Sequence, residues 1–242
     1  MHKKLEDIDV VILCGGLGKR LRPVTRDQPK VLANIGERAF LDILIDSLLQ
    51  YGFKHLILSV GYLKEKIIAH FNNYNPGCKI EFSEEEMPLG TGGAIRRTQP
   101  LIEADTFLVM NGDSICEADL SKFYDSHIKH RAILSMVLTK SQQVHDYGII
   151  EMDDYYRIKS FKEKVGHKDN SFINAGIYLM KKDIFSSMPD NEVFSLEYDF
   201  FPKILDNNKC YGFVCEGELI DIGTPERYAK ANQLFCKVSR EE

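Results

Sequence analysis

Near its N-terminus the chain reads Leu13-Cys14-Gly15-Gly16-Leu17-Gly18-Lys19-Arg20-Leu21-Arg22-Pro23, directly after the apolar residues 10–12. We interpret this stretch as a short buried strand that ends in a glycine-rich, basic turn. Glycines let backbone N–H groups close around a bulky anion, and the basic side chains add positive charge beside it. The stretch therefore indicates a phosphate-binding loop at the end of a first strand. The alternative is a tight turn whose basic residues only face water.

Two better-known phosphate loops do not match this turn. The dinucleotide-binding pattern G-x-G-x-x-G, counted from Gly16, needs a glycine where Leu21 stands. The P-loop pattern needs a glycine in place of Leu13 and a serine or threonine in place of Arg20. The observed pattern, G-G-x-G-x-R-L-x-P, therefore needs an explanation of its own.

The composition excludes several classes of protein. With 242 residues, 44% hydrophobic and 28% charged, the chain is typical of a soluble globular protein. A net charge of −5 argues against general binding to nucleic acids or membranes, so an anionic substrate needs a local basic site. The 6 cysteines form no C-x-x-C pair and no zinc-type cluster, so we expect buried, reduced thiols in a cytoplasmic protein. We expect neither a signal peptide nor a membrane span.

The first half of the chain alternates between strands and helices. Apart from the strand before the glycine loop, the pattern predicts strands over 55–60, 79–83 and 106–110 and helices over 41–51, 63–71 and 94–102. This order is typical of an α/β fold in which a sheet is layered with helices.

The second half is less regular and includes antiparallel strands. It predicts helices over 120–129, 196–206 and 226–238, and strands over 133–139, 148–151, 158–161, 172–180, 211–215 and 219–222. In the helix over 196–206 we expect four side chains to face a core: Tyr198, Phe200, Phe201 and Leu205. We expect one domain over 1–242, whose half over about 1–115 holds a nucleotide and whose half over about 116–242 holds something else against it.

A second glycine-rich turn, Pro88-Leu89-Gly90-Thr91-Gly92-Gly93, precedes the helix expected from residue 94. A flat ring can lie against such a backbone while main-chain groups read its edge, and the alternative is an ordinary helix-entry loop. Glu85 belongs to the acidic run just before the turn. It suits a contact to a base or a ribose, or it is part of a solvated face.

Two aspartates stand at the ends of expected strands. Asp113 closes Asn111-Gly112-Asp113, where an α/β sheet binds ligands beyond the carboxyl ends of its strands. An Asx-turn is the alternative. Asp221 stands between two isoleucines, and a buried carboxylate is costly unless it is paired or bound to metal. Asp113 and Asp221 could together hold one Mg²⁺ ion.

Other polar groups in the chain suit sugars and phosphates. Tyr147-Gly148, Glu163-Lys164 and Asn174-Ala175-Gly176 carry side chains that suit sugar hydroxyls and a sugar phosphate, although each alone is also typical of a surface or a turn. Lys30, after Pro29, can supply a positive charge to a phosphate, and taken alone it is also an ordinary surface lysine.

Taken in this order, the motifs resemble those of the sugar-1-phosphate nucleotidylyltransferases. That family opens with a strand and G-G-x-G-T-R-L-x-P-x-T, followed by P-K, and residues 15–25 and Pro29-Lys30 stand in these places. The turn 88–94 resembles its base-reading loop. Asp113 and Asp221 resemble its two metal-binding aspartates.

The resemblance extends to the second half. Glu163-Lys164 resembles the family's E-K-P motif, and residues 174–176 resemble its sugar-side strand. The chain departs from the family pattern at Lys19, Val31 and Val165.

The resemblance implies a fold and a reaction. The fold is Rossmann-like (GT-A-like), a three-layer α/β/α structure with a mixed, mainly parallel central sheet and a smaller antiparallel sugar-side sheet. The reaction joins an NTP and a sugar 1-phosphate to give an NDP-sugar and pyrophosphate, with Mg²⁺ as cofactor and in-line attack on the α-phosphorus. The implied protein is a monomer or a small homo-oligomer whose partners are small molecules.

It also implies a role for individual residues. The catalytic set is Arg20, Lys30, Asp113 and Lys164. The nucleotide-binding set is Leu13, Gly15, Gly16, Gly18, Arg20, Lys30, Glu85, Pro88, Gly90, Thr91 and Asp113. The sugar-phosphate-binding set is Tyr147, Gly148, Glu163, Lys164, Asn174 and Gly176. The metal ligands are Asp113 and Asp221.

Within the family, the chain is most similar to the D-glycero-α-D-manno-heptose 1-phosphate guanylyltransferases, which favours GTP and that heptose 1-phosphate. Enzymes that use UTP or dTTP with N-acetylmuramate, glucose or mannose 1-phosphate are the alternative. A GT-A glycosyltransferase would be expected to carry D-x-D where Asp113-Ser114-Ile115 stands. A non-catalytic relative would be expected to lack Lys30 or one of the two aspartates.

Overall fold

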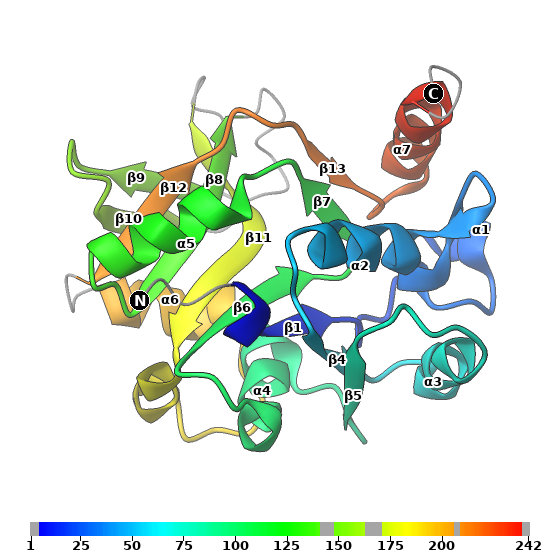
Figure 1. Cartoon of the computed structure of the whole chain (residues 1–242), viewed down its shortest axis with the longest axis horizontal. Helices are drawn as coiled ribbons and strands as arrows, with labels where there is room; N and C mark the ends of the chain where they lie inside the picture. The colour runs from blue at the N-terminus through cyan, green and yellow to red at the C-terminus, as the bar shows by residue number, and fades with distance from the viewer. Residues whose placement is uncertain (1–4, 141–147, 163–170, 206–208, 239–242) are drawn as a thin grey trace.

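The computed structural model describes residues 5–140, 148–162, 171–205 and 209–238. In this part of the chain the main sheet has nine strands (Figure 1). Four parallel strands from the first half lie in the order β5 (Lys79–Glu84), β4 (His55–Val60), β1 (Asp9–Leu13) and β6 (Thr106–Asn111). The sheet continues into the second half of the chain through β11 (Phe172–Lys181), which pairs with β6 in the antiparallel sense.

The second half adds the remaining strands. β8 (Leu134–Lys140) pairs antiparallel with β11, and β12 (Cys210–Val214) pairs parallel with β8. The hairpin of β9 (Ile149–Met152) and β10 (Ile158–Lys162) joins the far end of β11. Two small antiparallel sheets complete the described strands, one of β7 (Ser114–Cys116) with β13 (Leu219–Asp221) and one of β2 (Asn34–Ile35) with β3 (Arg38–Ala39). The predicted mixed, mainly parallel sheet with smaller antiparallel pairing is confirmed.

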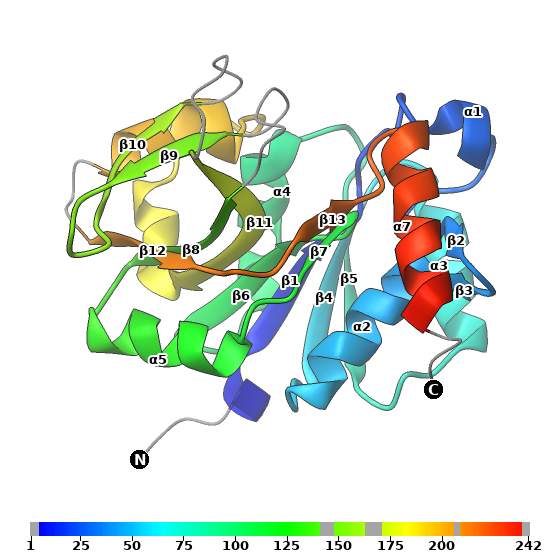
Figure 2. The ribbon, with the colours of Figure 1, turned by 90° about the horizontal axis from the view of Figure 1, so that it is seen from above.

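Helices cover both faces of the sheet (Figure 2). One face carries α2 (Phe40–Gln50), α3 (Lys64–Asn73) and α5 (Leu120–Lys129). The other face carries α4 (Gly90–Arg97) and the pair η6 (Leu196–Phe200) and α6 (Phe201–Ile204). The last helix, α7 (Pro225–Val238), packs beside the short helix α1 (Arg22–Thr25) and the β2–β3 hairpin (Figure 2). Short 3-10 turns stand at Leu5–Asp7, Lys30–Leu32, Gln99–Leu101 and Lys182–Ser187.

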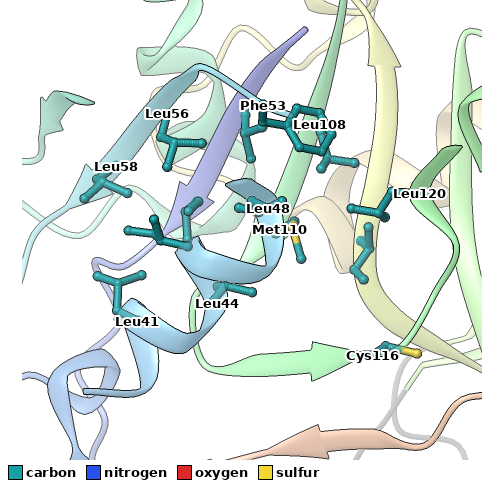
Figure 3. Close-up of a cluster of buried hydrophobic side chains, with 14 of the residues drawn as sticks. Leu41, Leu44, Leu48, Phe53, Leu56, Leu58, Leu108, Met110, Cys116 and Leu120 are labelled. Carbon is teal, nitrogen blue, oxygen red and sulfur yellow. The ribbon is translucent and has the colours of Figure 1, made fainter. Parts of the chain in front are cut away.

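The two faces arise from the alternation of side chains along the strands. In β1, Val10 and Ile12 belong to the core under α2 and α5, whereas Val11 belongs to the core under α4 and α6. All three are fully buried, as a parallel strand covered by helices on both faces requires. Figure 3 shows the first of these cores, in which leucines of α2 pack against leucines of β4 and β6.

Most of the predicted helices and strands lie close to their observed bounds, and two differ; the sequence predicts no counterpart of α1, β2, β3 or β7. The helix expected over 94–102 begins at Gly90 and ends at Arg97, because the glycines form its first turn. The helix expected over 196–206 begins as a π-helical turn, which directs Leu196 and Phe200 into the core. Tyr198, expected in that core, is instead 58% exposed.

The cysteines that the structure describes, five in number, carry free thiols, and all but Cys78 are buried. Burial raises the pKa of the Cys210 thiol to about 12. A thiol with such a pKa stays protonated and unreactive, so Cys210 acts as a small apolar group in its core. None of the described helices combines the length and the apolar character needed to cross a membrane.

His127 in α5 makes the fold sensitive to acid. Its Nδ1 lies 2.9 Å from the Ser135 hydroxyl, and its buried Nε2 has no hydrogen-bond partner among the residues that the structure describes. Burial, helped by the charge of Lys181, lowers the pKa of His127 from 6.5 to about 4. The folded protein therefore binds this proton less readily than the unfolded chain, so the stability from a neutral His127 is lost as the pH falls from about 6.5 to about 4.

We expect the free energy of unfolding to drop by about 3 kcal/mol over that range because of this histidine. The variant His127→Gln should lack this part of the pH dependence while keeping a hydrogen bond to Ser135. Urea unfolding at pH 7, 5.5 and 4 measures both proteins. Parallel pH profiles for the two would contradict the assignment.

Candidate active site

The carboxyl ends of the parallel strands form the framework of the site. The glycine loop follows β1 and is tied to its neighbours by backbone hydrogen bonds. Cys14 N donates to Ser59 O at 2.8 Å, and Gly112 N donates to Leu13 O at 3.0 Å. Tyr62 N, just after β4, donates to Gly15 O at 3.3 Å. The loop is therefore held between the ends of β4 and β6, where α/β sheets bind their ligands.

The glycines of this loop differ in the reason for which glycine stands there. A Cβ atom on Gly15 would lie 2.6 Å from Glu85 Oε1, so Gly15 is required by packing. Gly18 has a φ of +56°, a conformation that favours glycine. Gly16 faces open space within the described part of the chain, where nothing lies within 4 Å of a Cβ atom built there apart from its own chain neighbours. Neither packing nor φ explains Gly16, and the binding of a nucleotide there stays a prediction.

The acidic run before the second turn is divided between surface and interior. Glu84 and Glu86 form ion pairs with Lys64 at 3.1 and 2.9 Å. Glu85 is buried and accepts hydrogen bonds from Leu89 N at 3.0 Å and the Ser59 hydroxyl at 3.4 Å. Burial raises the pKa of this carboxyl group. Glu85 therefore stands beside the glycine loop and fixes the turn that leads into α4.

Packing accounts for part of the second glycine turn. A Cβ atom on Gly92 would lie 2.1 Å from the Phe194 ring, and one on Gly93 would lie 2.3 Å from Glu192 O. These two glycines are therefore needed for the close approach of residues 192–194. Gly90 is exposed and has a φ of +73°. A base-reading role for Pro88, Gly90 and Thr91 stays a prediction.

Lys30 and Asp113 meet at the end of β6. Lys30 opens a 3-10 turn after Pro29, and its ammonium group forms an ion pair with the Asp113 carboxylate. A Cβ atom on Gly18 would lie 3.2 Å from Lys30 Cβ, so the lysine stem passes directly beside the glycine loop. Both side chains are partly exposed, at 16% and 29%, and can therefore reach a ligand.

The second aspartate comes from the far end of the chain. It ends β13, which lies beside β7 (Figure 2). Asp221 is the register partner of Ser114, and Ile222 N donates to Asp113 O at 3.0 Å. The Asp221 carboxylate accepts hydrogen bonds from Gly223 N at 2.8 Å and from Arg227 Nη1 at 3.3 Å. This pairing explains how a carboxylate with only 11% exposure is tolerated between two isoleucines.

Arg20 completes this cluster. A Cβ atom on Gly223 would lie 3.5 Å from Arg20 Nη2. Arg20 reaches this position because Leu21 and Ile222, both fully buried, belong to one small core with Phe40 of α2 and Ala231 of α7. The structure thus brings together Arg20, Lys30, Asp113 and Asp221, which are spread over 200 residues of sequence.

On the other side of β6, the strand β11 carries two of the expected sugar-side residues. Gly176 has a φ of +74°, and a Cβ atom there would lie 2.4 Å from Asn111 Nδ2. Asn174 N donates to Gly148 O at 3.1 Å, and Asn174 Oδ1 accepts from Gly176 N at 2.9 Å. These residues therefore lie next to the end of β6. Tyr147, Glu163 and Lys164 lie outside the described residues.

Two residues beside the site, Tyr62 and Arg227, belong to no motif recognised in the sequence. Arg227 contacts Asp221, and the guanidinium of Arg22 lies 5.0 Å from the centre of the Tyr62 ring. Their sequence signals are weak. Tyr62 follows the end of a parallel strand, and Arg227 stands in the first turn of the last helix, six residues after the aspartate.

The sequence profile of the Nucleotidyl transferase family matches residues 9–238. Two similar proteins are named D-glycero-alpha-D-manno-heptose 1-phosphate guanylyltransferase. The one from Aneurinibacillus thermoaerophilus is 38% identical over 93% of this chain and 97% of its own length. The one from Campylobacter jejuni is 37% identical over 91% of this chain and 97% of its own length.

Solved structures give the same result. The crystal structure of HddC from Yersinia pseudotuberculosis is 39% identical to this chain and superposes with a TM-score of 0.85. That likeness covers 94% of this chain and 99% of HddC, and HddC has also been solved in complex with GMP-PN. The chain therefore belongs to the nucleotidyl transferase family, and it is a nucleotidyltransferase of the kind that acts on sugar 1-phosphates.

Proposed function

We propose that this protein joins GTP and D-glycero-α-D-manno-heptose 1-phosphate to give GDP-heptose and pyrophosphate. One observation carries the proposal: Arg20, Lys30, Asp113 and Asp221 converge beside a glycine loop at the carboxyl ends of parallel strands. The choice of GTP and of the heptose is supported by the relatives that carry these substrates in their names. The complex of HddC with GMP-PN supports a guanine nucleotide.

The nucleotide would bind along the edge of the sheet. Its triphosphate would lie against Gly15, Gly16 and Gly18, where Gly16 leaves open space. Arg20 would act on the leaving pyrophosphate, and Lys30 would neutralise phosphate charge. The base would lie on residues 85–91, against the turn that Glu85 fixes.

The two aspartates suit Mg²⁺. Carboxylates are the ligand type that Mg²⁺ prefers, and the pairing of β7 with β13 brings Asp113 and Asp221 to neighbouring backbone positions. Their present partners are the side chains of Lys30 and Arg227 and the amide of Gly223, so cations and donors already surround these carboxylates. When bound by Asp113 and Asp221, Mg²⁺ would supply charge neutralisation for the phosphate oxygens.

The protein's own contribution is positioning and charge. An oxygen of the sugar 1-phosphate attacks the α-phosphorus in line, the bond to the bridging oxygen breaks, and pyrophosphate leaves. The attacking phosphate is already ionised at neutral pH, so no general base is needed. We infer that Arg20, Lys30 and Lys164 stabilise the charge that builds up, and that the sugar 1-phosphate lies against Gly148, Asn174 and Gly176, with Tyr147 and Glu163 on its hydroxyls.

Substrate choice can be measured directly. Four nucleoside triphosphates are each combined with the 1-phosphates of the heptose, mannose, glucose and N-acetylmuramate in the presence of Mg²⁺, and pyrophosphate release is followed. We expect the highest kcat/KM for GTP with the heptose. A strong preference for UTP or dTTP would contradict the base assignment, and a preference for another sugar would contradict the heptose assignment.

The glycine loop offers a matched pair of variants. Gly16→Ala adds a methyl group to open space, so we expect the free energy of unfolding to change by less than about 0.5 kcal/mol. We expect kcat/KM for the nucleotide to fall at least about tenfold, because the methyl group would occupy the place of a phosphate.

Gly15→Ala provides the contrast. Its methyl group would collide with Glu85, so we expect a loss of about 1–3 kcal/mol in stability. Denaturant unfolding and steady-state kinetics separate the two effects. A fully active Gly16→Ala protein would show that the triphosphate does not lie at Gly16.

A further inference from the structure

A segment from the second half of the chain lies across the first turn of α4, and we refer to residues 189–197 as the strap. Its backbone is bonded to the turn in both directions. Phe194 N donates to Leu89 O at 3.0 Å, and Phe194 O accepts from Gly92 N at 3.0 Å and from Gly93 N at 3.2 Å. The N–H groups of Gly92 and Gly93, in the first turn of α4, are therefore already bonded to a carbonyl of the strap, which argues against a phosphate at these two groups.

Side chains add a second layer of contacts. The Thr91 hydroxyl donates to Glu197 Oε2 at 2.7 Å and accepts from Leu196 N at 2.9 Å. The Ser195 hydroxyl donates to the same Glu197 oxygen at 2.7 Å. The Thr91 hydroxyl thus bonds to the strap both as a donor and as an acceptor. Glu197 is the acceptor that holds Thr91 and Ser195 together.

Arg96, further along α4, holds the start of the strap. Its guanidinium donates to the carbonyl groups of Pro189 and Asn191, and it lies 5.2 Å from the centre of the Phe194 ring. The strap is therefore attached to α4 on both sides of Phe194.

The strap is also anchored in the core of the second half. Leu196 lies within the strap, and Phe200 and Phe201 follow it. The side chains of these three residues are 0–1% exposed. The Phe201 ring lies 5.2 Å from the ring of Tyr178 on β11 and 5.3 Å from that of Phe161 on β10. The turn before α4 thus takes its position from strands of the sugar side and not only from its own half of the chain.

We propose that the strap positions the base-reading turn, with Glu197 as the positioning residue, and that it thereby sets nucleotide affinity and base selectivity. This inference rests on the proposed function, which assigns the base to residues 85–91. Glu197 acts through Thr91: it fixes the hydroxyl and, with it, the backbone of the turn.

The test compares Glu197→Ala with Glu197→Gln. The alanine variant loses the shared acceptor, so we expect the KM for the nucleotide to rise about tenfold while the KM for the sugar 1-phosphate stays within twofold. We also expect the ratio of kcat/KM for GTP to that for UTP to fall. Glu197→Gln keeps a carbonyl oxygen as acceptor. It should therefore have a nucleotide KM and a GTP-to-UTP ratio of kcat/KM close to those of the wild-type protein.

Glu6→Ala is the matched control, because Glu6 also accepts a hydrogen bond from a side chain but lies before β1, at the other end of the sheet. It should leave unchanged the KM for the nucleotide, the KM for the sugar 1-phosphate and the ratio of kcat/KM for GTP to that for UTP. A Glu197→Ala protein with a lower Tm but unchanged nucleotide KM and GTP-to-UTP ratio would overturn the proposal, because a merely structural role predicts that result.

The substrate assignment and the proposed role of the strap can be contradicted by different results. If the wild-type protein prefers another triphosphate, the GTP assignment fails, and the same KM comparison is made with the preferred one. If no transfer is found with any sugar 1-phosphate, the affinity for the nucleotide alone, measured by calorimetry, replaces KM. Equal affinities of wild-type and Glu197→Ala proteins would then overturn the role of the strap.

Discussion

The site depends on the antiparallel pairing of β7 with β13. Asp113 precedes β7 and Asp221 ends β13, so two carboxylates separated by more than a hundred residues occupy neighbouring backbone positions. Lys30 forms an ion pair with Asp113 and Arg227 forms one with Asp221, so each carboxylate has a cation beside it. Without the strand pairing, the first half of the chain would keep its glycine loop and Asp113, but Asp221 would not lie beside them.

Close packing between chain segments also shapes the rest of the site. Gly15, Gly112 and Gly176 each bring one backbone against another chain segment, at distances that a Cβ atom would prevent. Burial of Leu21 against Ile222 sets Arg20 beside the second aspartate. The cores beneath these loops are built from strands that are buried on both faces, and this gives the loops a rigid base.

Local patterns in the sequence predict the elements well, and they predict contacts between distant segments poorly. Continuous apolar runs identify strands such as His55–Val60, and helical spacing identifies Leu120–Lys129, at the bounds observed. Motifs also predict that Asp113 and Asp221 belong to the site, because an aspartate at the end of an apolar strand is unusual. The strap around Phe194 has no such local signal, since its function comes from contacts to a turn a hundred residues earlier. The expectation that Tyr198 faces the core is wrong, because a π-helical turn changes the residue spacing from which helix faces are assigned.

The proposed metal site can be tested by a crystal structure with Mn²⁺ and a GTP analogue that resists hydrolysis. We expect an anomalous scattering peak for Mn²⁺ within bonding distance of carboxylate oxygens of both Asp113 and Asp221, beside the α-phosphate. We also expect the peak to be lost when Asp221→Asn is crystallised under the same conditions. A peak bound by other side chains, or a peak that persists in the variant, would contradict the proposed metal site.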